Sequence, residues 1–224
     1  MTEHNEPKSL KVWDPVVRIG HWVIVAGVLT AYIAGDDSET LHVTAGYIVA
    51  GTVLFRILWG IIGSRHARFS DFIRGPGAIF SYLKSLFSGK SERHIGHNPA
   101  GGAMIIALLI SLLGTTGAGM SLYALEHGKG PLAPALASFR DAPADMSETS
   151  SVPSTHEDEG EDEHEEGEHH EGGLIGLVAG LHKFFVYLTL SLAGLHVIGV
   201  FLSSRAHKEN LALAMITGRK KSDD

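Results

Sequence analysis

An apolar stretch from Leu174 to Leu202 constrains the fold of this chain more than any other feature. Among its 29 residues the only Asp, Glu, Lys or Arg is Lys183. Because about 20 apolar residues suffice to cross a bilayer, the stretch predicts a transmembrane helix. It contains His182 and His196, fourteen residues apart. In a helix that spacing puts both on one face, roughly 21 Å apart along the axis, and ionisable groups at membrane depth usually have a function.

Three more apolar segments, at about residues 16–34, 41–62 and 103–125, are long enough to be further spans. Residues 69–87 predict a short interfacial helix between spans two and three, interrupted at Gly75-Pro76-Gly77. The predicted fold class is therefore an all-α membrane protein, a four-helix transmembrane bundle. We divide the chain into an arm at 1–14, spans one to three at 15–125 with a cytoplasmic segment at 63–99, a loop at 126–173, span four at 174–202 and a tail at 203–224.

The distribution of charge predicts how the bundle is oriented. Lys and Arg are concentrated in the arm, in the segment between spans two and three, and in the tail. The other two connections are acidic, and one of them accounts for most of the formal net charge of −7. Because positively charged connections stay in the cytoplasm, both termini are expected there, which four spans allow. We also expect no cleaved signal peptide, since the first apolar segment is followed by more spans.

The chain has no cysteine. This excludes disulfides, cysteine-ligated iron–sulfur clusters, thiolate ligation of haem and covalent attachment of haem at a CxxCH motif. Any haem must therefore be held without a covalent link.

The four intramembrane histidines sort into two pairs by their predicted depth. Span one runs outward and span two returns, so His21 lies towards the cytoplasm and His42 near the outer surface. Span four runs inward, with His182 at the outer level and His196 at the inner level. Each level thus holds two histidines from different helices. Two ligands on opposite faces of a flat macrocycle require this arrangement.

Two imidazoles at each level fit haem better than zinc. Zinc prefers about four ligands in tetrahedral geometry, whereas haem iron needs two axial ligands. We therefore expect two non-covalently bound b haems (iron protoporphyrin IX). Since histidine would occupy both axial positions of each iron, electron transfer is the expected task.

Three cations within the spans are candidate partners of the haem propionates. Arg18 and Arg56 lie at the inner level and Lys183 at the outer level. Each can pair with a carboxylate, and the alternative is that each reaches to the lipid headgroups. Glycines on the spans, Gly114 and Gly119 among them, let helices or a macrocycle approach closely.

Several short motifs lie at or beside these histidines and cations. They are Val12-Trp13-Asp14-Pro15, Arg18-Ile19-Gly20-His21-Trp22, Leu41-His42-Val43-Thr44-Ala45-Gly46-Tyr47, Phe55-Arg56-Ile57-Leu58-Trp59-Gly60 and the two histidines of span four. As a set they resemble the prokaryotic di-haem cytochromes b, which comprise cytochrome b-561 and the b-type subunit of nickel–iron hydrogenases. The resemblance covers nearly all four spans and fails in the loop from about residue 126 to 173.

The resemblance implies a bundle in the bacterial inner membrane, with His21, His42, His182 and His196 as the ligands of two haems. It also implies exchange of electrons between membrane quinone and a periplasmic redox partner, namely a hydrogenase, another dehydrogenase or a cytochrome c. Stand-alone cytochrome b-561 resembles a superoxide:quinone oxidoreductase, so direct oxidation of superoxide is an alternative. Whether the chain is an enzyme stays open. Lipid is an expected partner and nucleic acid is not.

Residues 156–171 form an acidic, histidine-rich tract with ten carboxylates, four histidines and no Lys or Arg. Such a tract cannot bury a core, so we expect a disordered periplasmic loop. It can be interpreted as a solvated linker, as a weak site for divalent metal, or as a surface that attracts a basic partner. It also suggests an alternative of another class, a metal-binding membrane transporter, which leaves the paired intramembrane histidines unexplained.

Overall fold

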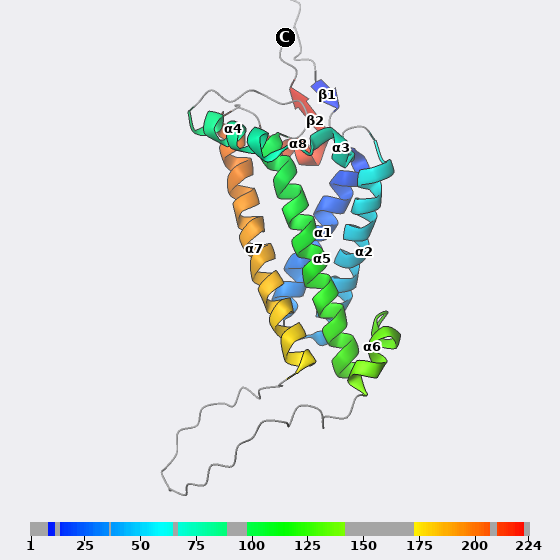
Figure 1. The fold of residues 1–224 in the computed structure, drawn as a ribbon. Helices are drawn as coiled ribbons and strands as arrows, with labels where there is room; N and C mark the ends of the chain where they lie inside the picture. Colours follow the sequence, from blue (N-terminus) through cyan, green and yellow to red (C-terminus); the bar gives the residue numbers. More distant parts are fainter. Residues whose placement is uncertain are drawn as a thin grey trace, which may run out of the picture.

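Four long helices dominate the computed structural model, which describes residues 9–11, 14–35, 37–64, 67–88, 98–141, 173–206 and 210–221. They are α1 (Pro15–Ala34), α2 (Glu39–Ile62), α5 (Pro99–His127) and α7 (Leu174–Ala206), and each is long and apolar enough to cross a membrane. Figure 1 shows them side by side as a bundle. Large apolar side chains stay exposed on its outside, as a lipid-facing surface requires; Ile33 is 75% exposed and Ile62 is 72% exposed. The prediction of a helical bundle with four candidate spans is confirmed.

The ends of these helices follow from local sequence signals. Asp14 caps α1, because its carboxylate accepts a hydrogen bond from the backbone N–H of Val16 at 2.7 Å, and a proline follows at the first helical position. Asn98 caps α5 in the same way, accepting from the N–H of Gly101 at 2.6 Å. Gly128 ends α5 in the left-handed conformation, with φ of 63°, which glycine adopts without steric cost.

Shorter elements fill the connections. Residues 69–87 form two helices, α3 (Phe69–Phe72) and α4 (Pro76–Phe87), because the proline disfavours helical backbone in the residue before it. Figure 1 shows α4 lying crosswise to the long helices. A further helix, α6 (Ala133–Arg140), folds within the stretch that the sequence predicted as loop, and α8 (Leu211–Thr217) folds within the predicted tail. The acidic tract at 156–171 lies outside the described residues.

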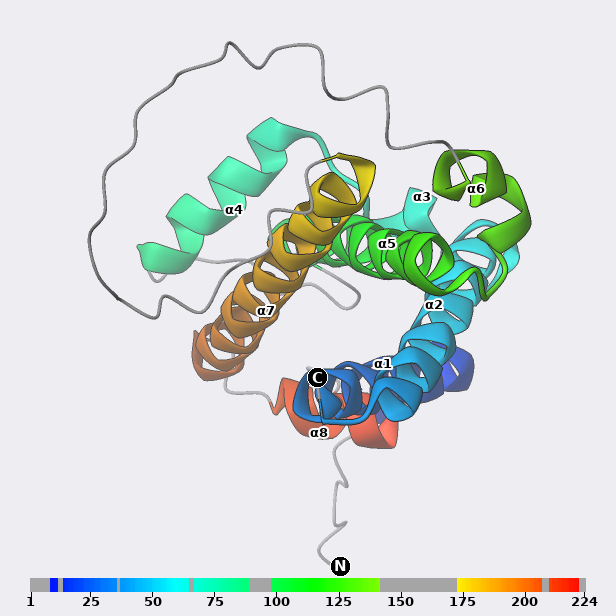
Figure 2. The ribbon, with the colours of Figure 1, turned by 90° about the horizontal axis from the view of Figure 1, so that it is seen from below.

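The long helices pack in the order α1, α2, α5, α7. The closest pairs are α1 with α2 and α5 with α7, and α2 packs on α5 to join them. Figure 2, a view from below, shows the four helices arranged around a centre in this order. The hydrophobic core lies between α2 and α5, where Val49, Val53, Leu109 and Leu112 are buried.

A seam of small and hydroxylated residues holds α7 against α5. The hydroxyl of Thr189 is 2.6 Å from that of Ser111 and 3.0 Å from that of Thr115. Gly114 faces the ring of Phe185, leaving no room for a larger residue. In lipid, close approach and interhelical hydrogen bonds take the place of hydrophobic burial as the source of helix association.

The two described ends of the chain meet at one end of the bundle. Strand β1 (Ser9–Lys11) pairs antiparallel with β2 (Arg219–Lys221). Next to this pair, the guanidinium of Arg18 on α1 donates hydrogen bonds to the carbonyl oxygens of Met215 and Ile216 in α8. The C-terminal segment is thereby tied to the start of α1.

Candidate functional site

The four intramembrane histidines lie in two pairs, each of which joins two helices. His21 of α1 faces His196 of α7, with ring centroids 6.5 Å apart and an angle of 54° between the rings. His42 of α2 faces His182 of α7, with centroids 6.1 Å apart and an angle of 73°. We call the first couple the inner pair and the second the outer pair. The structure thus brings together the same couples that predicted depth assigned to each other, and their role as ligands stays a prediction.

The separations can be compared with the distance that one shared metal ion requires. A bond from a metal ion to an imidazole nitrogen is about 2 Å long. With ring bonds of about 1.35 Å, each nitrogen lies about 1.2 Å from the ring centroid. Two imidazoles on opposite sides of one iron therefore have centroids about 6.4 Å apart. The observed separations of 6.5 and 6.1 Å agree with this value, so both pairs fit axial ligation of a haem.

A tetrahedral metal site is not formed by the same side chains. Among the residues that the structure describes, no group of three or more His, Cys, Asp or Glu could hold a metal ion. At each level the described residues offer two imidazoles and no third ligand. The donor set therefore suits a macrocycle that supplies the remaining ligands itself.

Backbone carbonyl groups orient both rings of the outer pair. Nδ1 of His42 lies 2.9 Å from the carbonyl oxygen of Ala31, and Nδ1 of His182 lies 2.9 Å from that of Thr115. Because a carbonyl oxygen can only accept, each Nδ1 carries the proton. In a neutral ring the other nitrogen, Nε2, is then unprotonated and able to bind a metal ion.

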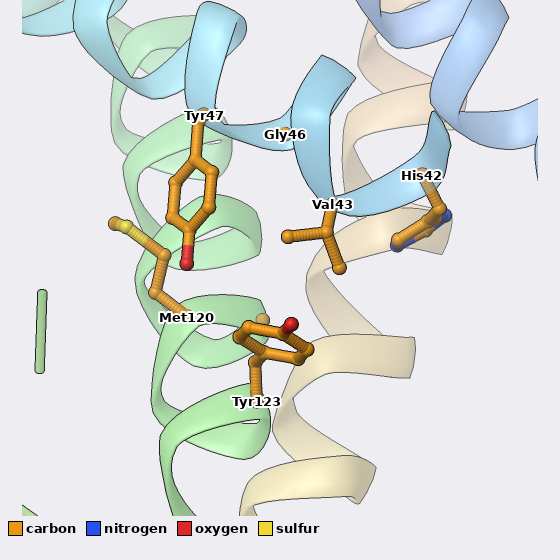
Figure 3. Close-up of a pocket in the computed structure, with 7 residues that line it drawn as sticks. His42, Val43, Gly46, Tyr47, Met120 and Tyr123 are labelled. Atoms are coloured by element: carbon orange, nitrogen blue, oxygen red, sulfur yellow. The ribbon is translucent and has the colours of Figure 1, made fainter. Parts of the chain in front are cut away.

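Small residues make room for the outer pair. A Cβ atom added to Gly119 would lie 2.9 Å from Cε1 of His182, so only glycine lets this ring lie against α5. On the side of His42, a small pocket opens between α2 and α5, with the side chains of Tyr47 and Tyr123 entering it from the two helices (Figure 3). The hydroxyl of Tyr47 is buried there and finds no hydrogen-bond partner in the part of the chain that the structure describes. The pocket is lined by His42, Val43, Gly46, Tyr47, Gly119, Met120 and Tyr123.

An aromatic ring contacts the inner pair, and a buried cation lies towards the same end of the bundle. The indole of Trp22 meets the ring of His21 edge-on, with centroids 5.2 Å apart. Arg56 is only 9% exposed. Its guanidinium donates to the carbonyl oxygen of Ala67 at 3.2 Å and lies over the ring of Phe69, 5.3 Å from its centroid. These contacts hold the positive charge at the end of α2 that lies on the side of the inner pair.

The two other predicted propionate partners have different surroundings. Arg18 already donates to two carbonyl oxygens of α8 and lines a groove between α1 and α8. Lys183 is exposed and, within the described residues, makes no hydrogen bond or ion pair. Neither arrangement tests the predicted contact with a propionate, which stays a prediction for both.

Sequence reasoning missed the groups that orient the outer pair. The acceptors at Ala31 and Thr115 are backbone carbonyls, which every residue type supplies, so no side-chain pattern could have indicated them. Gly119 was identified only as one of several glycines that allow close approach. Its spacing from other residues carries no sign that it contacts His182.

The chain was then compared with known proteins. The family model described as "Prokaryotic cytochrome b561" matches residues 12–218. A "Probable Ni/Fe-hydrogenase B-type cytochrome subunit" of Azotobacter chroococcum mcd 1 is 28% identical over 153 residues, covering 54% of this chain and 62% of the relative. The protein with the same description from Azotobacter vinelandii is 28% identical over 152 residues, with the same two shares. That of Rhizobium leguminosarum bv. viciae is 24% identical over 152 residues, covering 55% of this chain and 64% of the relative.

These alignments have a limited extent. They span less than two thirds of each of these relatives. The comparison with solved structures gave no match. The family model, by contrast, matches nearly the whole chain, including all four histidines and all four long helices. This chain therefore belongs to the prokaryotic cytochrome b561 family.

Proposed function

We propose that the chain holds two b-type haems, an inner one on His21 and His196 and an outer one on His42 and His182. The observation that carries this proposal is the presence of two imidazole couples, each across two helices, at separations of 6.5 and 6.1 Å. The family is that of a b-type cytochrome, and the lack of cysteine requires non-covalent binding.

Ligation by two histidines suits transfer of electrons. A bound b haem supplies reversible one-electron oxidation and reduction. The two histidines of each pair would hold the iron between them, which would leave it no open position for water or substrate. On α7, His182 and His196 lie roughly 21 Å apart along the helix axis, which puts the two sites at different depths of the membrane.

The cations are proposed to bind the haem propionates. Arg56 is the best supported, since its guanidinium is buried and, of its five N–H groups, only one makes a hydrogen bond within the described residues, to the carbonyl of Ala67. Its planar fork matches a carboxylate. Arg18 has further N–H groups beyond those that contact α8. Lys183 adjoins His182 at the outer level.

The proposed place of the protein is the bacterial inner membrane, with both termini in the cytoplasm and α4 at the interface. The basic connections support this orientation, and the exposure of Phe80 on α4, 73%, supports contact with lipid. Because the chain has no cysteine, single cysteines at Asp37 and Asn210 would test the orientation. In intact cells an impermeant thiol reagent should label the first and not the second, and the reverse pattern would invert the topology.

The redox role we propose is transfer between membrane quinone and a periplasmic partner. The relatives' description as hydrogenase cytochrome subunits supports a hydrogenase-like partner. The purified protein should be reduced by a quinol analogue under anaerobic conditions, as seen in its haem absorbance. A protein that contains haem and is not reduced by any quinol would contradict this role.

Haem quantification in single-histidine variants tests the ligation. The wild type should contain two haems per chain, and H182A and H196A should contain one each. His127, which lies outside the pairs and contacts Glu39 at 3.7 Å, gives the matched control: H127A should keep two. A colourless wild-type preparation, or variants that both keep two haems, would end the proposal.

A further inference from the structure

The two histidine pairs differ in what their Nδ1 atoms contact. In the outer pair, both Nδ1 atoms donate to backbone carbonyl oxygens, that of His42 to Ala31 and that of His182 to Thr115. In the inner pair, Nδ1 of His21 is buried and has no hydrogen-bond partner among the described residues. The other inner histidine likewise makes no hydrogen bond within the part of the chain that the structure describes. Within the described residues, both imidazoles of the outer pair are therefore hydrogen-bonded and neither imidazole of the inner pair is.

This difference changes how strongly the imidazoles donate electrons. An imidazole that gives its Nδ1–H to a carbonyl oxygen is more basic at its other nitrogen. A more basic ligand stabilises the oxidised iron, which carries more positive charge, more than the reduced iron. Hydrogen bonding around the axial ligands is one of the protein's means of setting a haem's reduction potential.

We propose that the two carbonyl acceptors make the outer haem the lower-potential site and leave the inner haem the higher-potential site. The inference rests on the ligation proposed above. For a one-electron couple, a tenfold greater preference for the oxidised state lowers the midpoint by about 59 mV. We expect the outer midpoint to lie below the inner one by at least about that amount. Electrons that reach the outer site then move downhill to the inner one.

The charges near the two sites also favour a higher reduction potential at the inner haem than at the outer one. Arg56, 9% exposed, lies on the side of the inner pair, where a buried positive charge disfavours the oxidised iron. Asp14 offsets part of this charge. At the outer level Lys183 is exposed and can extend to the lipid headgroups, where water and salt screen its charge. The inner site is therefore the one whose potential a cation raises.

Gly119 is the positioning residue through which the hydrogen bond of His182 can be disturbed. An added Cβ would lie 2.9 Å from Cε1 and 3.1 Å from Nδ1 of that ring. Alanine at this position must therefore push the ring away from the carbonyl of Thr115. Gly117 lies on the same helix, and a Cβ added there would meet nothing within 4 Å. G117A is thus the matched control for G119A.

The experiment is an optical redox titration of the purified protein in detergent. H196A, which retains the outer haem, and H182A, which retains the inner one, assign the two midpoints. In the wild type the outer midpoint should be the lower. G119A should raise the outer midpoint and leave the inner one unchanged, whereas G117A should change neither. The near-infrared charge-transfer band of the oxidised haems gives a second measure, because its position follows the basicity of the imidazoles.

An outer midpoint equal to or above the inner one in the wild type would overturn the inference. A G119A protein that keeps two histidine ligands at the outer iron, with that midpoint unchanged or lowered, would also overturn it. If G119A loses the outer haem, the wild-type order of midpoints and the band positions decide alone. A wild type with fewer than two haems would instead refute the proposed ligation, so the two failures are distinct.

Discussion

Replacing Gly114 by alanine should push α5 and α7 apart more than alanine at Gly117 or Gly119 would. The added Cβ would lie 2.5 Å from two carbons of the Phe185 ring and 2.7 Å from a third. Carbon atoms in contact normally lie about 3.5–4.0 Å apart. The ring or the helix must therefore move by about 1 Å, and the seam formed with Thr189 resists that movement.

The cost can be set against a control on the same helix. Overpacking of this kind typically costs about 1–3 kcal/mol. G117A adds the same methyl group where nothing lies within 4 Å, and the gain of about 1 kcal/mol in helix propensity is common to both variants. The two variants should therefore differ in free energy of unfolding by the cost of overpacking alone, roughly 1–3 kcal/mol. For a chain of this size that corresponds to roughly 2–12 °C in Tm.

Thermal unfolding of both variants in one detergent, followed by far-ultraviolet circular dichroism, measures this difference. Haem absorbance in the same samples should show earlier loss from the outer site in G114A, since Phe185 lies three residues from His182 on α7. A G114A protein as stable as G117A would show that α5 and α7 do not pack as closely as the structure has them.

Three further substitutions test other contacts. D14A removes the cap of α1 and should cost about 1 kcal/mol at pH 7. Partial burial raises the pKa of Asp14, but hydrogen bonds from Ser64 and from backbone N–H groups outweigh it, so the pKa is lowered in the fold. The difference in Tm between D14A and wild type should therefore shrink only below about pH 4. A difference in Tm that stays constant as the pH falls would contradict this. T189V removes two interhelical hydrogen bonds and should lower stability by about 1 kcal/mol, so an unchanged melt would count against the seam. R18M frees the carbonyl groups of α8 and should speed tryptic cleavage after Arg219 several-fold; equal rates would show that Arg18 does not hold the tail.

Hydropathy predicted the long helices because few backbone conformations are stable inside a lipid bilayer. A segment that crosses a bilayer must satisfy its own backbone hydrogen bonds, so long apolar stretches become helices whatever their neighbours. Local signals also account for their ends, since Asp14 caps α1 and Pro15 is its first residue. The pairing of the histidines could also be predicted, because the depth of each one in the membrane depends only on its position along its span and on the direction in which that span runs.

Elements that depend on contacts between distant parts of the chain could not be predicted in this way. The helices α6 and α8 have eight and seven residues, too few to be stable alone, so they form only where the bundle supports them. The pairing of β1 with β2 joins residues about 210 apart, and no local pattern signals it. Arg18 was predicted to reach a propionate or a lipid headgroup, and nothing in the sequence indicated its bonds to α8.

One consequence concerns the unequal position of α7 in the bundle. This helix packs chiefly on α5, yet it contributes one imidazole to each pair, opposite α1 and opposite α2. Under the proposed ligation, the two haems would link α7 to both of those helices and so connect the two ends of the row of four. In cells that lack iron or porphyrin, α7 should then be held chiefly by α5. Quality-control proteases should degrade this haem-free chain, and α7 should be the first helix that they attack.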